Sequence, residues 1–169
     1  MTVTRLRRSS GGPASPPFFA GPLLAAVALC LFALPLPAQQ TSDEYSRQRA
    51  AIPAPLAPEV LLLDITALGD RLIAVGVRGH IVVSDDAGAS WRQITEVPTR
   101  ATLTAVATRG DRAWAVGHDS VILASDDRGE SWRLEYADIE AEQPLMDVWF
   151  ADDGTGLAIG AYGLLMDSQ

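Results

Sequence analysis

The sequence is poor in the side chains that build disulfides and metal centres. Cys30 is the only cysteine in 169 residues, and His80 and His118 are the only histidines. A single cysteine cannot form an intramolecular disulfide and offers no cysteine-based metal site. A site built on both histidines would need a third ligand, for which Asp119 is the only obvious neighbour. We therefore predict neither a metal site nor a cofactor.

Basic residues are also scarce. The chain has 13 arginines and no lysine against 21 aspartates and glutamates, so its formal net charge is −8. Recognition of nucleic acid depends on a basic surface, which this composition argues against. No Ser/His/Asp spacing, phosphate-binding glycine loop or general acid and base pair stands out either. We predict a protein that does not bind nucleic acid and has no catalytic residues.

Long apolar runs are absent except near the N-terminus. Residues 1–38 begin with three arginines and no acid, continue as an apolar run from Phe18 to Leu36, and end at the small residue Ala38. This order is typical of a secretory signal peptide, cleaved here after Ala38. The alternative is a retained membrane anchor, for which the core at 23–34 is short. We predict export to the periplasm or the extracellular space, with no segment left to insert into a membrane.

What the sequence does contain is an internal repeat. The stretch Ser84–Trp91, SDDAGASW, returns as SDDRGESW at Ser125–Trp132, 41 residues later. The tripeptide AVG at 74–76 returns at the same distance as 115–117, and AIG at 158–160 begins a third copy that reaches Ser168 and Gln169. A fixed period of this size indicates a repeat architecture.

The repeated octapeptide suits a tight turn between two strands. An aspartate can accept hydrogen bonds from backbone N–H groups of the turn, the glycine adopts positive φ, and the tryptophan packs against a neighbouring unit. Two adjacent aspartates could also suggest a calcium loop, but such loops need more oxygen ligands converging on one point. We assign structural roles to Ser84, Asp86, Gly88, Trp91, Ser125, Asp127, Gly129 and Trp132.

Short, β-branched runs bounded by turn signals fill each repeat. We predict an all-β fold, a β-propeller of four-stranded antiparallel blades at about 60–101, 102–143 and 144–169, the last with three strands. Residues 39–59, rich in proline and alanine, form a linker or lead-in strand. The predicted strands are 61–66, 71–77, 80–84, 91–95, 103–108, 112–117, 121–125, 132–136, 145–151, 156–160 and 164–167.

The octapeptide resembles the Asp-box, also called the bacterial neuraminidase repeat. With the surrounding pattern LIAVGVRGHIVVS at 72–84, residues 60–169 look most like the photosystem II assembly and stability factors and their bacterial relatives. This resemblance implies a seven-bladed ring, of which the chain holds two blades and most of a third. A truncated product or partial sequence would explain the shortfall, as would closure by self-association.

The resemblance also implies a function. It suggests an exported, non-catalytic module that binds a protein partner and helps to assemble a membrane or envelope complex, which in phototrophs is photosystem II. The alternative is a glycoside hydrolase, because sialidases carry the same boxes. Such an enzyme needs an arginine cluster for its substrate, and no recognisable arginine motif precedes the first box.

The hairpins between the second and third strands of each unit are the expected place for binding. Strand order puts them at the opposite end of the blades from the Asp-boxes, near the mouth of the propeller channel. The alternative is that these tips are polar only because they are solvated. The candidate binding residues are Arg78, His80, His118, Asp119 and Tyr162.

Overall fold

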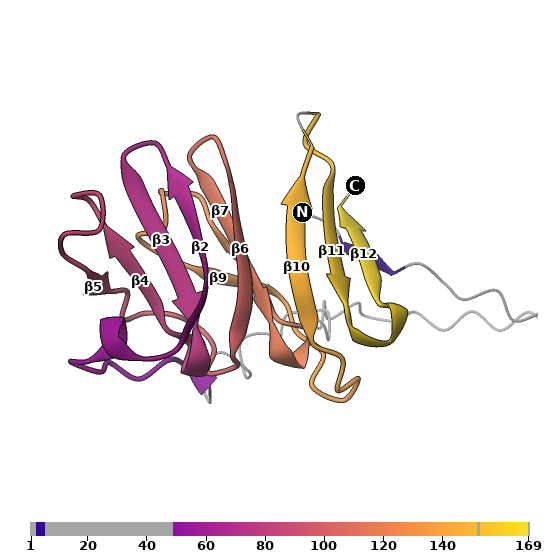
Figure 1. Cartoon of the computed structure of the whole chain (residues 1–169). Helices are drawn as coiled ribbons and strands as arrows, with labels where there is room; N and C mark the ends of the chain where they lie inside the picture. The colour runs from indigo at the N-terminus through magenta and orange to yellow at the C-terminus, as the bar shows by residue number, and fades with distance from the viewer. Residues whose placement is uncertain (1–2, 6–48, 152, 169) are drawn as a thin grey trace, which may run out of the picture.

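The computed structural model describes residues 3–5, 49–151 and 153–168, which form three four-stranded antiparallel sheets (Figure 1). The first contains β2 (Leu62–Leu68), β3 (Arg71–Gly76), β4 (Ile81–Ser84) and β5 (Arg92–Gln93). The second contains β6 (Leu103–Arg109), β7 (Arg112–Gly117), β8 (Ile122–Ser125) and β9 (Arg133–Tyr136). The third contains β10 (Leu145–Phe150), β11 (Gly156–Gly160), β12 (Leu165–Ser168) and β1 (Val3–Arg5). We call the three sheets blades 1, 2 and 3.

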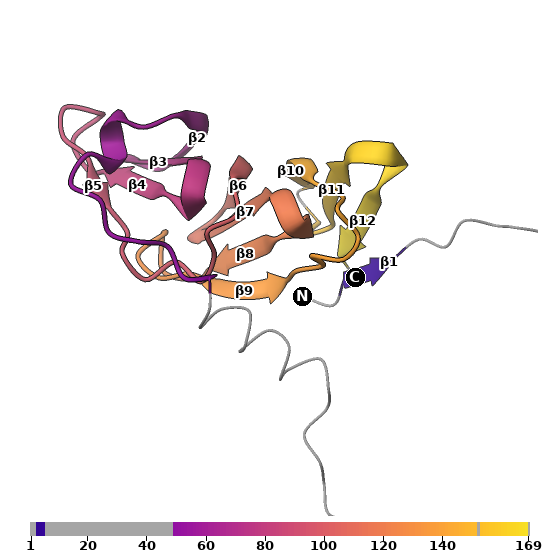
Figure 2. The ribbon, with the colours of Figure 1, turned by 90° about the horizontal axis from the view of Figure 1, so that it is seen from below.

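Each blade is a simple meander, as the all-β prediction required. Within blades 1 and 2 the strands pair in chain order, and in blade 3 the order is β10, β11, β12, β1. The inner strands β2, β6 and β10 follow one another on one side of the molecule, and the outer strands lie on the opposite side (Figure 2). This is the arrangement of consecutive propeller blades.

The predicted strand boundaries differ from the observed ones by a few residues. The largest difference is in β5, which has two residues where five were predicted. The backbone N–H of Ile94 still donates to the carbonyl of Ile81 at 2.9 Å, so the pairing continues beyond the assigned strand.

The glycine of the repeated AVG and AIG elements has a packing reason. A Cβ on Gly76 would lie 2.2 Å from the Leu61 carbonyl oxygen, and one on Gly117 would lie 2.1 Å from that of Thr102. At both places the first strand bulges after its first residue and crosses close to the second. The crossing therefore leaves no room for a side chain.

The hydrophobic core lies between the blades. One cluster joins blades 1 and 2 and includes Ile73, Ile81, Leu103 and Leu123, all fully buried. A second cluster joins blades 2 and 3 around Leu145. Because each blade buries its apolar side chains against its neighbour, the relative placement of the blades follows from the core itself.

Blade 3 has a fourth strand that the sequence did not predict. Val3, in β1, pairs with Ser168, at the end of β12, so a segment far away in the sequence takes the outer position. The prediction of three strands was based on local sequence alone, which does not reveal pairing between distant segments. β1 lies within the predicted signal peptide, whose remaining residues and cleavage site are outside the described part of the chain.

The lead-in segment covers one face of blade 1. Arg49 is helical, and from Ala50 to Leu61 the segment forms no strand, only the 3-10 turn η1 (Ala57–Glu59). Ala54 and Ala57 pack on Ala74 and Val82 of the blade. No helix in the described residues is long and apolar enough to cross a membrane.

Candidate functional site

The loops of the blades gather at two opposite ends. The Asp-boxes lie at the upper end in Figure 1, and the short turns η2 (Val77–Gly79), η3 (His118–Ser120) and η4 (Ala161–Gly163) lie at the lower end. We call the lower end the tip face, defined by these three turns. All five candidate binding residues belong to the turns of the tip face or lie directly beside them.

The middle residue of each turn has a left-handed backbone. Arg78, Asp119 and Tyr162 have φ values of 59°, 58° and 58°. Residues other than glycine adopt this conformation infrequently and often at functional sites, although Ala87 and Arg128 of the Asp-boxes adopt it as well. The Tyr162 side chain is 79% exposed. One backbone geometry thus presents three chemically different side chains at equivalent positions.

The two histidines do not come together as a pair. His118 is exposed at the start of η3, whereas His80 follows η2 and is 3% exposed. Burial lowers the pKa of His80, and the positive charge of Arg78 lowers it further, although a hydrogen bond with the Ile52 backbone acts in the opposite direction. No group of three histidine, cysteine or acidic residues in the described part of the chain could hold a metal ion.

The turn η3 is tied to its surroundings. The Asp119 carboxylate forms an ion pair with Arg49 of the lead-in segment at 3.2 Å. The backbone carbonyl of Asp119 accepts a hydrogen bond from the N–H of Asp138 at 2.8 Å. The buried hydroxyl of Ser120 donates to the Gln143 carbonyl at 2.6 Å. The connection from blade 2 to blade 3 is therefore held against the tip face.

In the first Asp-box, Asp86 and Ser84 organise the turn. The Asp86 carboxylate accepts the Ser90 backbone N–H at 2.8 Å and the Ser90 hydroxyl at 2.5 Å. The Ser84 hydroxyl donates to Asp86 at 2.7 Å and accepts the Gly88 N–H at 2.8 Å. The hydrogen bonds from Ser90, assisted by the one from Ser84, lower the pKa of Asp86 to about 2. Trp91 donates its indole N–H to the Gly88 carbonyl at 3.2 Å.

The second box repeats these contacts. Ser125 donates to Asp127 at 2.8 Å and accepts the Gly129 N–H at 2.9 Å. Asp127 also accepts the Ser131 N–H at 2.9 Å, and Trp132 donates to the Gly129 carbonyl at 3.1 Å. In both copies the carboxylate of the second aspartate accepts hydrogen bonds from residues of the same turn, so its role is structural.

The first aspartate of each box forms ion pairs instead. Asp85 lies 2.6 Å from the Arg71 guanidinium, and Asp126 lies 2.5 Å from that of Arg112. Glu130, from the second box, reaches back to Arg71 at 2.7 Å and so links blade 2 to blade 1. The paired aspartates of a box thus serve different partners and do not converge on one point.

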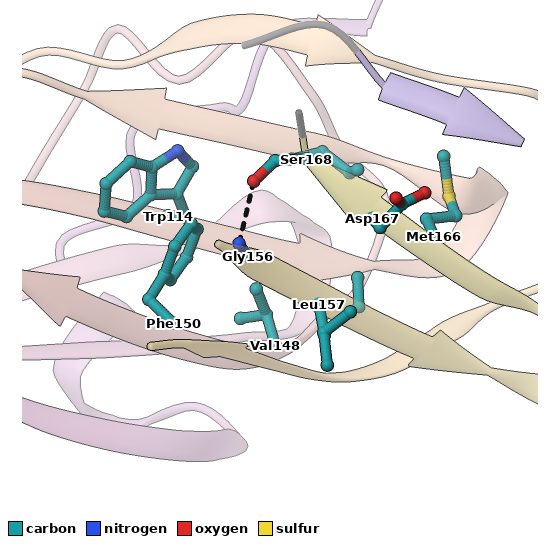
Figure 3. Close-up of a pocket in the computed structure, with 10 residues that line it drawn as sticks. Trp114, Val148, Phe150, Gly156, Leu157, Met166, Asp167 and Ser168 are labelled. Carbon is teal, nitrogen blue, oxygen red and sulfur yellow. Dashed lines mark hydrogen bonds between the residues drawn. The ribbon is translucent and has the colours of Figure 1, made fainter. Parts of the chain in front are cut away.

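Figure 3 shows a cavity between blades 2 and 3 that the sequence did not predict. Its volume is about 10 Å³, and its wall includes the stacked rings of Trp114 and Phe150, whose centroids are 4.0 Å apart. The Ser168 hydroxyl accepts the Gly156 N–H beside it at 2.8 Å. A space of this size holds at most about one water molecule, so it is a packing defect and not a ligand site.

A larger pocket opens beside the tip face. Its volume is about 370 Å³, and it is lined by Ile52, Ala54, Arg78, His80 and Arg100. Sequence reasoning identified Arg78 and His80 from the hairpin position. Sequence reasoning did not select Arg100, Ile52 or Ala54 as site residues. No local pattern shows that the lead-in segment folds back beside the first hairpin.

Comparison with known proteins supports the fold. No protein-family model matches the chain, and no curated protein matches it. Among solved structures, YCF48 bound to D1 peptide is similar to this chain with 22% sequence identity and a TM-score of 0.56, over 63% of this chain and 36% of that one. YCF48 from Cyanidioschyzon merolae is similar with 22% identity and a TM-score of 0.55, over 69% of this chain and 38% of that one. The chain spans little more than a third of the length of these structures, and the likeness shows that it has the β-propeller fold of YCF48.

Proposed function

We propose that this chain is part of a non-catalytic β-propeller that binds a protein partner through its tip face. The observation that carries the proposal is the repeated left-handed residue at positions 78, 119 and 162. Holding a side chain in this conformation costs of order 1–3 kcal/mol, and such strain is concentrated at functional sites. The chain adopts it at three equivalent turns, each time with a different residue type.

Three further observations agree with a binding role. The side chains at these positions are cationic, anionic and aromatic, a mixture suited to a protein surface. The aspartates of the Asp-boxes, the most prominent acidic pairs of the chain, are occupied by hydrogen bonds and ion pairs at the other end of the blades. A structurally similar protein, YCF48, has been solved with a bound peptide.

We further propose that the protein works outside the cytoplasm, in the assembly of a membrane or envelope complex. Support for export comes from the basic and then apolar N-terminal sequence that ends at Ala38. The assembly role rests on the resemblance to the photosystem II assembly factors. Photosystem II itself is the partner to test in a phototrophic host.

Site-specific crosslinking in the native host tests the tip face. A photoreactive phenylalanine analogue replaces Tyr162 in one variant and Asp119 in a second. The matched control carries the analogue at Asp70, an exposed residue of the turn between β2 and β3, which lies at the opposite end of β3 from η2. We expect a discrete crosslinked partner band from positions 162 and 119 and none from position 70.

The same experiment can refute the proposal. Equal crosslinking from Asp70 would mean that the tip face is not the binding surface. Absence of any adduct at positions 119 and 162, in a chain that is folded and correctly exported, would mean that this face does not bind a protein.

A further inference from the structure

The 370 Å³ pocket beside the tip face has walls from three parts of the chain. Ile52 and Ala54 come from the lead-in, Arg78 and His80 from the turn η2 and its end, and Arg100 from the connection between blades 1 and 2. The volume falls within the range of sites for small ligands, which is roughly 300–1,000 Å³.

The charges at this pocket are the opposite of those of the whole protein. The chain carries a net charge of −8, yet the two charged residues that line the pocket are both arginines. Arg100 is held in place because its Nε donates to the Ala50 carbonyl at 2.7 Å. Arg78 makes no hydrogen bond or ion pair with any other residue that the structure describes. Two guanidinium groups without an acid between them favour an anion in the pocket.

The remaining walls are apolar or neutral. Ile52 is 56% exposed despite its apolar side chain, so a ligand that covers it would remove apolar surface from water. His80 is buried, and the lowered pKa leaves its ring uncharged at neutral pH. Its Nδ1 has no hydrogen-bond partner among the described residues.

We propose that this pocket binds a carboxylate carried on a small apolar group. Arg78 and Arg100 pair with the carboxylate, whose planar geometry matches the guanidinium fork, and Ile52 and Ala54 contact the apolar part. The same chemistry is found at the end of a peptide chain and in a free short-chain acid. The proposal names a ligand chemistry and a pocket that the binding role of the tip face does not specify, and so goes beyond that role.

Binding is measured on the full folded chain with three probes. These are isovalerate, the tripeptide acetyl-Ala-Ala-Leu with a free carboxylate, and the same tripeptide with a C-terminal amide. The imidazole Hε1 signals report the site, because the chain has only two histidines and a His118→Gln variant assigns them. We expect a carboxylate probe to shift the His80 signal and to leave that of His118 in place.

Variants separate the pocket from non-specific attraction. Arg78→Gln should weaken binding about tenfold or more, because it removes one partner of a charge pair. The substitution breaks no hydrogen bond or ion pair with the described residues, so the fold should persist. Arg112→Gln, at the Asp-box end, is the matched control and should bind as the unaltered chain does.

The outcomes decide both the site and the source of the carboxylate. Binding of isovalerate and the acid tripeptide would show that a free short-chain acid suffices, and binding of the tripeptide alone would identify a chain end. Equal binding of the amide, no loss in Arg78→Gln, or no binding of either acid would overturn the proposal. Crosslinking at Tyr162 needs no carboxylate, so the two proposals can fail separately.

Discussion

Alanine substitution of one glycine in each Asp-box should give very different losses of stability. Gly88 and Gly129 occupy the same place in the two boxes, with φ values of 90° and 85°. Alanine in a left-handed conformation costs about 1–2 kcal/mol, and this cost applies equally to both sites. Any difference between the two variants must therefore come from what surrounds the added methyl group.

The surroundings differ because Gly129 faces the neighbouring blade. A Cβ at Gly129 would lie 2.8 Å from Cδ1 of Ile73, whereas at Gly88 the nearest atom is Cδ1 of Leu72 at 3.7 Å. Ile73 is fully buried, so its side chain cannot move aside freely. Overpacking of this kind costs about 1–3 kcal/mol. We expect Gly88→Ala to lose about 1–2 kcal/mol of unfolding free energy and Gly129→Ala about 2–5 kcal/mol.

Urea unfolding followed by tryptophan fluorescence measures both losses. Ile73→Val supplies the control, since it removes Cδ1 and by itself costs about 0.5–1.5 kcal/mol. In that background Gly129→Ala should cost no more than Gly88→Ala, and the double-mutant cycle should show the coupling. Equal losses at the two glycines, or a Gly129→Ala loss that Ile73→Val leaves unchanged, would refute the proposed contact between blades.

Three further predictions concern the second box and its contact with blade 1. Ser125→Ala should lower the unfolding free energy by about 1–3 kcal/mol, because the buried hydroxyl accepts the Gly129 N–H, which would lose its partner. Partial burial tends to raise the pKa of Asp127, but hydrogen bonds from serine hydroxyl and backbone N–H groups outweigh it and lower that pKa to about 2. The stabilisation of the fold by the Asp127 carboxylate should therefore be complete above pH 3.8, the ordinary pKa of an aspartate, and should disappear as the pH falls through about 2. Asp127→Asn should abolish this part of an acid titration followed by circular dichroism. Glu130→Gln weakens the ion pairs that this half-exposed carboxylate forms with Arg71 and Arg92, and should cost less than about 1 kcal/mol in urea unfolding at low salt, with a smaller effect at 1 M salt.

The sequence predicted the features that depend on local pattern. The 41-residue period located the blades, and turn chemistry placed the Asp-boxes between the third and fourth strands. A short acid and a glycine at fixed spacing leave few alternatives to the turn that Asp86 and Gly88 form. The sequence also predicted that Arg78, Asp119 and Tyr162 lie at the opposite end of the blades from the Asp-boxes, because successive loops of a meander alternate between its two ends.

What the sequence could not predict depends on contacts between distant segments. The pairing of β1 with β12 joins the two ends of the described chain, and no local pattern indicates it. The packing of Ala57 on Ala74 is equally invisible, because small apolar residues occur throughout the lead-in. The left-handed backbone at Arg78 and Tyr162 was missed because neither residue type signals positive φ, although the glycine that follows each of them marks a turn.

At the Asp-box end, an arginine of blade 1 forms ion pairs both within its own blade and with blade 2. Arg71 and Arg112 hold equivalent positions, and each pairs with the first aspartate of its own box. Among the residues that the structure describes, Arg71 also pairs with an acid from the next box, Glu130, whereas Arg112 pairs with Asp126 alone. Its side chain is 14% exposed, whereas that of Arg112 is 45% exposed. Arg71 is thus partly covered by the box of the neighbouring blade, so the interface between blades 1 and 2 includes an ion-pair network built from repeated residues.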